Sequence, residues 1–80
     1  MTLYLGSHLK IRLRTTTSLP ELAGLVDELA REIGLDDRAR HTLPLPDLIA
    51  ACAVLTKEDS GALACCSLAG QALARLSPPA

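Results

Sequence analysis

The side chains best suited to chemistry in this sequence are three cysteines, Cys52, Cys65 and Cys66, and two histidines, His8 and His41. Thiolate and imidazole groups bind zinc or copper, and reactive thiols act in redox sensing. Structural zinc sites usually pair ligands two to four residues apart, whereas adjacent cysteines on a helix point about 100° apart. We therefore expect the cysteines to pack in the core, with no metal and no cofactor. A thiol-based metal or redox sensor that uses all three cysteines is the alternative.

The sequence contains no recognisable catalytic arrangement. His41 follows Arg40, but neither a Gly-x-Ser-x-Gly nucleophile motif nor a Cys/His signature accompanies it. The glycines do not cluster into a phosphate-binding loop. We therefore expect no enzymatic activity, no catalytic residue and no cofactor-binding residue.

The composition favours helices and argues against several classes of partner. The 80 residues include seventeen Leu and twelve Ala, both strong helix formers, and Tyr4 is the only aromatic residue. A net charge of −1 without a broad basic face or aromatic stacking residues argues against nucleic acid. The longest apolar runs, 48–55 and 61–70, are shorter than the about 20 residues that a membrane span needs. An odd number of cysteines and no secretion signal at the N-terminus predict a cytoplasmic protein.

The N-terminal region predicts β-structure. Residues 9–15 alternate apolar and basic side chains, with Leu9, Ile11 and Leu13 on one face, as in a half-buried strand. Residues 2–5 supply a short first arm, and a glycine at position 6 suits the turn between the arms. This pattern predicts a β-hairpin.

Three helices are expected after the hairpin. Ser18 and Glu21 form a capping box, apolar residues then recur at helical spacing, and Gly34 suits a helix stop, so a helix is predicted over 19–33. Prolines at 44 and 46 separate this region from helices predicted over 47–56 and 61–76. The fold class is therefore α+β: a single small domain over 1–76, in which an N-terminal β-hairpin (2–5 and 9–15) packs against three helices (19–33, 47–56 and 61–76). Residues 77–80 are expected to be a disordered tail.

Two surfaces stand out as candidates for binding. The last two helices are apolar nearly all round, and a helix with two apolar faces needs two neighbours, which so short a chain does not readily supply. The small Ala and Cys side chains can also be exposed without consequence. Lys10, Arg12 and Arg14 form a basic ladder on one strand face. The ladder can dock an acidic protein, or it can stay solvated and protect a sheet edge, which is the favoured alternative.

We therefore expect a non-catalytic protein–protein interaction module that acts as a small regulatory or inhibitory accessory protein. Small inhibitors of bacterial, phage or mobile-element origin have this character. The expected partners are another protein with an acidic surface and a second copy of the chain in a homodimer. A small non-catalytic subunit of a larger enzyme complex is a further alternative. The residues expected to bind partners are Lys10, Arg12, Arg14, Leu68, Ala72 and Leu76.

Overall fold

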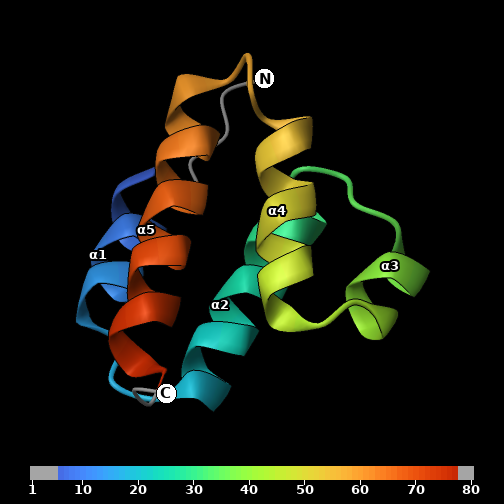
Figure 1. Ribbon diagram of the computed structural model, residues 1–80. Coiled ribbons are helices and arrows are strands. Elements are labelled where there is room, and N and C mark those ends of the chain that lie inside the picture. The colour runs from blue at the N-terminus through green and yellow to red at the C-terminus, as the bar shows by residue number, and fades with distance from the viewer. Residues whose placement is uncertain (1–5, 78–80) are drawn as a thin grey trace.

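The computed structural model describes residues 6–77, and the regular secondary structure in this range is entirely α-helical. Five helices follow one another in this range, and it contains no strand (Figure 1). Their bounds are α1 Gly6–Thr15, α2 Leu19–Glu32, α3 Asp37–Thr42, α4 Leu45–Leu55 and α5 Ser60–Leu76.

The predicted hairpin, and with it the α+β fold class, is wrong. Residues 9–15 lie within α1, and the other predicted arm, 2–5, lies outside the described residues. Leu9 and Leu13 are buried, whereas Ile11 is 58% exposed. Residues four apart share a face both in a strand and in a helix, so these two leucines satisfy either period. Ile11 distinguishes the two structures, because it would share the face of Leu9 and Leu13 in a strand but lies on the opposite side of a helix.

The start of α2 depends on local side-chain contacts. Ser18 is the N-cap, and its Oγ accepts a hydrogen bond from the Glu21 backbone N–H at 3.3 Å, as the capping box predicts. The Glu21 carboxylate does not complete the box by bonding Ser18. It instead accepts a hydrogen bond from the buried Thr16 hydroxyl, which lowers the pKa of Glu21. The α1–α2 loop is therefore fixed to the first turn of α2.

The end of α2 is a Schellman motif, in agreement with the predicted stop. Gly34 has φ +88°, a left-handed conformation that glycine adopts without a Cβ clash. The Leu35 N–H donates to the Ala30 carbonyl at 2.9 Å, and the Gly34 N–H donates to the Arg31 carbonyl at 3.2 Å. The chain then turns into α3.

Helix α3 is held against α2 by Arg40. The Arg40 guanidinium lies 3.2 Å from the Asp27 carboxylate of α2 and also pairs with Asp37 in its own helix. Only 11% of the Arg40 side chain is exposed, which makes this a mostly buried contact.

The two later helices start slightly earlier than predicted. Helix α4 begins at Leu45, because Pro46 fits in the first turn, where no backbone N–H is needed. Helix α5 begins at Ser60, after the Asp59 side chain, which accepts a hydrogen bond from the Ala62 N–H at 3.2 Å. Both predicted helices are otherwise confirmed.

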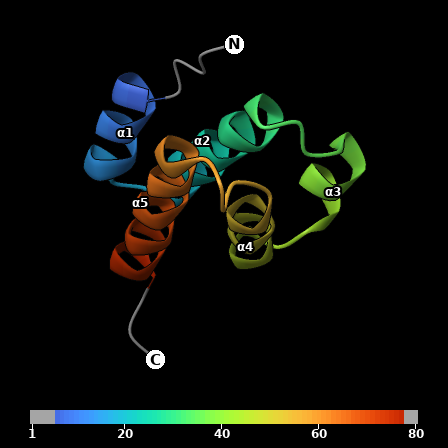
Figure 2. The ribbon, with the colours of Figure 1, turned by 90° about the horizontal axis from the view of Figure 1, so that it is seen from above.

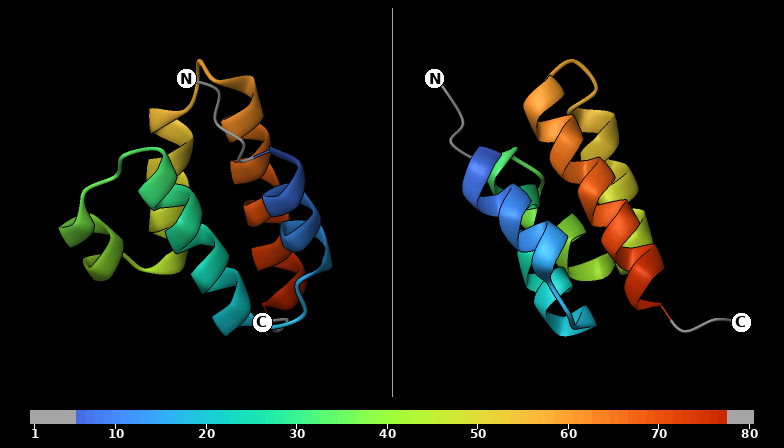
Figure 3. Two further views of the ribbon diagram at one scale, coloured as in Figure 1. Left: turned by 180° about the vertical axis from the view of Figure 1, so that it is seen from behind. Right: turned by 90° about the vertical axis from the view of Figure 1, so that its left-hand side faces the viewer.

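The helices form two layers. Helices α4 and α5 stand side by side in front of α1 and α2, as the views from above and from the side show (Figures 2 and 3). Helix α5 contacts α1, α2 and α4, so it is the central element. The core between the layers consists of leucines from α1 and α2 packed against small residues of α5, with the largest fully buried side chains being Leu13, Leu22, Leu29, Val26, Cys52 and Cys65.

Candidate protein-binding surfaces

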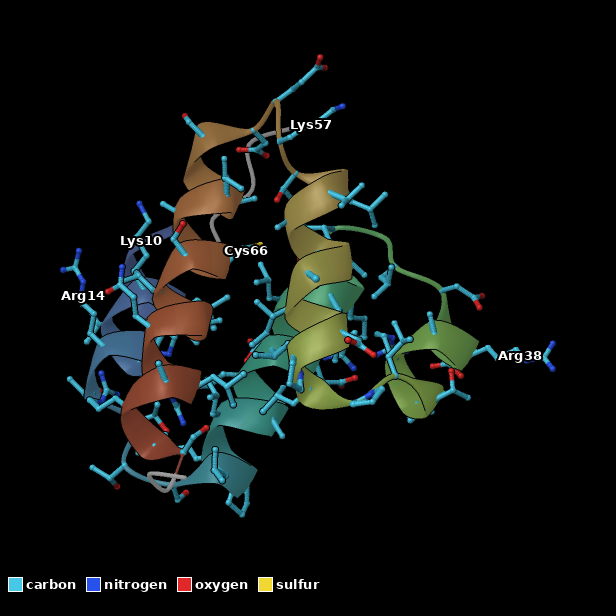
Figure 4. The ribbon with its side chains drawn as sticks, in the orientation of Figure 1. Lys10, Arg14, Arg38, Lys57 and Cys66 are labelled. Carbon is cyan, nitrogen blue, oxygen red and sulfur yellow. The ribbon has the colours of Figure 1, made fainter. Side chains whose placement is uncertain are left out.

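Two of the three cysteines meet at the contact between α4 and α5. Cys52 and Cys66 are both buried, and the Thr56 hydroxyl lies between them, 2.8 Å from the Cys52 carbonyl oxygen and 3.5 Å from the Cys66 Sγ (Figure 4 labels Cys66). Burial raises the pKa of the Cys52 thiol to about 11, and the nearby Cys66 thiol contributes to this rise. Cys52 is therefore protonated at neutral pH and is a poor nucleophile.

Cys65 faces a different neighbour. It is buried, and burial raises the pKa of its thiol, although the Lys10 ammonium of α1 acts in the opposite direction. The two histidines do not join the thiols: His8 is exposed on α1, and His41 lies on α3 with its Nδ1 3.7 Å from the Asp37 carboxylate. Within residues 6–77, no three His, Cys, Asp or Glu side chains are grouped as a metal site requires. In this arrangement the thiols serve as small core residues.

The predicted basic ladder is split by the helix. Residues 10 and 14 are one helical turn apart, so Lys10 and Arg14 lie on the same side of α1, at the outer edge of the molecule (Figure 4). Arg12 projects from another side, near Glu21, whose pKa it helps to lower. None of the three has a carboxylate within 4.0 Å among residues 6–77. We call Lys10 and Arg14 the basic edge.

The three apolar residues predicted on the last helix differ in accessibility. Ala72 is completely buried in the core, so it is not available to a partner in this structure. Leu68 and Leu76 are half-buried and pack against the same core. Helix α5 is central, and its contacts with α1 and α4 supply the two neighbours that its two apolar faces need.

A surface that the sequence pattern did not identify lies on the outside of the α4–α5 layer. Residues 48–56 and 60–74 contain no charged side chain. Both helices bury one side against the rest of the protein, and they lie side by side in the front layer (Figure 1). Five exposed residues in the middle parts of these helices define the uncharged face: Ala50 and Val54 of α4, and Ser67, Gln71 and Ala74 of α5. The exposed charges Asp47 and Arg75 lie about one helical turn beyond it, in the first turn of α4 and the last turn of α5. The signal in the sequence was the length of the uncharged runs.

The charged residues are correspondingly crowded elsewhere. Residues 6–44 carry twelve of the seventeen charged side chains, and residues 45–77 carry five, which flank the uncharged runs. In Figure 4, Arg14 and Arg38 lie at opposite margins of the view, and Lys57 lies in the turn that joins α4 to α5. Val54, 69% exposed, is the most exposed large apolar residue of the described chain.

Comparisons with known proteins give no family. No protein-family model matches the chain, and no curated protein or solved structure is significantly similar to it. None of the helices in residues 6–77 is both long and apolar enough to span a bilayer. The function is therefore inferred from the chain's own surfaces.

Proposed function

We propose that this chain is a non-catalytic protein-binding module, a small regulatory or inhibitory accessory protein. The observation that carries the proposal is the segregation of charge: residues 6–44, which form α1, α2 and α3, carry most of the charged residues, whereas the middle parts of α4 and α5 expose residues without charge. An exposed helix surface without charge and with apolar side chains is typical of a protein interface. Three buried, unpaired thiols suit a reducing compartment, so the proposal includes a cytoplasmic location.

The basic edge supplies a contact for a second protein. Lys10 and Arg14 project from one side of α1 without a carboxylate partner in the described chain, and α1 itself contains no acidic residue. Opposite charges across an interface accelerate association and select the partner. The partner that fits this edge is an acidic protein surface. Arg14 also lies in the last turn of α1, where a cation stabilises a helix by about 0.3–1 kcal/mol.

A charge-reversal pair tests the proposal. The tagged protein is used to capture partners from a lysate of the organism that encodes it, as wild type, as Arg14→Glu and as Arg38→Glu. Arg38 is the matched control, because it is equally an exposed helical arginine but lies on α3, at the opposite margin of the molecule (Figure 4). We expect an acidic protein to be recovered with wild type and Arg38→Glu, and at least about tenfold less of it with Arg14→Glu.

The expected partner has a second signature. Its recovery falls as salt rises from about 50 to 300 mM, since exposed charge contacts are screened over this range. Far-UV circular dichroism of each variant establishes that the helices are intact. Equal recovery with both variants, or no specifically recovered protein at any salt concentration, would contradict the proposed function.

A further inference from the structure

We infer that the acidic partner of this chain presents an amphipathic helix, which docks along the contact between α1 and α5. This inference rests on the proposed function and deepens it, because it names the kind of partner that the basic edge selects. We call the docking surface the basic seam, and it consists of Lys10 and Arg14 of α1 with Leu68 and Arg75 of α5. The basic seam therefore extends the basic edge onto a second helix.

Charge separates α1 and α5 from the other helices. All nine acidic residues of the chain lie between Glu21 and Asp59, so neither α1 nor α5 contains one. The two helices carry four bases, which are Lys10, Arg12, Arg14 and Arg75. The net charge of the whole chain is −1, so positive charge is concentrated on these two neighbouring helices. A partner that complements them is acidic.

The cations of the basic seam follow the line along which α1 and α5 pack. The two helices run side by side in the same direction (Figure 3). Lys10 lies close enough to the Cys65 thiol of α5 to oppose the rise of its pKa. Farther along, the Arg75 Nη2 donates a hydrogen bond to the Thr16 carbonyl at 2.9 Å. Arg14 shares its side of α1 with Lys10, so it borders α5 as well.

Leu68 gives the basic seam an apolar anchor. It lies seven residues before Arg75, or about two helical turns, so both side chains are on the side of α5 that faces α1. Leu68 is half-buried, which leaves part of it accessible, and Arg14 and Arg75 are exposed. No carboxylate of residues 6–77 lies within 4.0 Å of the three cations. The surface therefore offers cations beside an apolar side chain, which matches a helix with acidic and apolar residues on one side.

The direction of α1 and α5 favours a helix as the docked segment. Both helices end at the same end of the molecule, and Arg14 and Arg75 lie in their last turns. A helix that runs antiparallel to both places its first turn, where acidic residues are favoured, opposite these two arginines. Acidic residues four positions apart in that helix are about 6 Å apart along its axis, which equals the spacing of Lys10 and Arg14 along α1.

Fluorescence anisotropy of a labelled peptide with the full chain tests the inference. The probe is a peptide of about 20 residues composed of Glu, Ala and Leu, with the leucines at helical spacing so that they form one side. The control peptide has the same composition in scrambled order. We expect the probe to bind wild type with a dissociation constant of about 100 µM or lower at about 50 mM salt, and about tenfold more tightly than the control peptide.

Variants of the basic seam identify the surface that binds the probe. Arg75→Glu should weaken binding by at least about tenfold, and Leu68→Gln by about fivefold. Arg75→Gln keeps a donor for the Thr16 carbonyl but loses the charge, so it should also weaken binding, whereas Arg75→Lys keeps the charge and should retain most of it. Arg38→Glu, on α3, is the matched control and should bind the probe as wild type does. Far-UV circular dichroism of each variant establishes that the helices are intact.

The outcomes separate this inference from the proposed function. Equal binding of the probe and the control peptide, or no binding at about 500 µM chain, overturns the inference, while capture through Arg14 still decides the proposed function. Binding of the probe that Arg75→Glu and Leu68→Gln both leave unchanged also overturns it. Sedimentation velocity without peptide gives a third test, because self-association that Arg75→Glu abolishes would assign the basic seam to a second copy of this chain instead.

Discussion

Leu13 and Ile11 give the sharpest test of the helical N-terminal region. Both side chains would be buried on one face of a strand, but in α1 Leu13 is fully buried and Ile11 is 58% exposed. Truncating Leu13 to alanine removes three buried carbons, worth about 2.4 kcal/mol, and the cavity left against the core increases the loss to about 3 kcal/mol. Ile11 is only about two-fifths buried, so Ile11→Ala loses about two-fifths of the same transfer free energy, about 1 kcal/mol. The better helix propensity of alanine restores about 0.4 kcal/mol of this loss.

Urea unfolding followed by far-UV circular dichroism measures both changes. A domain of this size has a total stability of about 4–12 kcal/mol, so Leu13→Ala should lower the urea midpoint by at least about 1 M. Ile11→Ala should shift it by less than a third of that amount. Equal losses for the two variants would mean that both side chains are buried together, as in a strand, and would refute the helical assignment.

Two further predictions concern single positions. Gly34→Ala should destabilise the protein by about 1 kcal/mol, because a φ of +88° strains an L-residue. Gly24→Ala should instead stabilise it by about 0.5 kcal/mol, because Gly24 lies inside α2 with open space around its Cβ position. Thermal unfolding measures both changes, and the same sign for the two variants would contradict this account. Raising the pH from 9 toward 11 should destabilise the protein, because the Cys52 thiol, with a folded pKa of about 11 against 9.0, ionises first in the unfolded chain. The stabilisation that comes from the protonated Cys52 thiol is present in full below pH 9 and is on the order of 2 kcal/mol. Cys52→Ala should remove this thiol's share of the fall in unfolding free energy between pH 9 and 11.

The elements that the sequence predicted well are those with local stop and start signals. The extent of α2 followed from Ser18 and Gly34, whose contacts involve residues only a few positions away. Helices α4 and α5 were found to within two residues at their starts because Asp59 and the prolines are equally local signals. Such contacts form between neighbours in the chain, so they do not depend on tertiary packing.

The N-terminal error came from giving the apolar pattern precedence over propensity. Leucine, lysine and arginine, which make up most of residues 9–14, are good helix formers, and Ile11 alone favours a strand. The buried positions Leu9, Leu13 and Thr16 are spaced four and three residues apart, which is one side of a helix. The alternation was therefore compatible with both structures, and propensity was the observation that distinguished them.

The positions of the exposed residues on the last two helices could not be predicted from the sequence. An apolar helix such as α5 offers no sequence contrast between its buried and exposed sides, so the burial of Ala72 depends on where α1 and α4 pack. The uncharged face could be located only when α4 and α5 were seen to lie side by side. The basic edge depends on the helical structure of α1. In a strand Lys10, Arg12 and Arg14 would share one face, whereas in the helix Lys10 and Arg14 share a side and Arg12 lies on another.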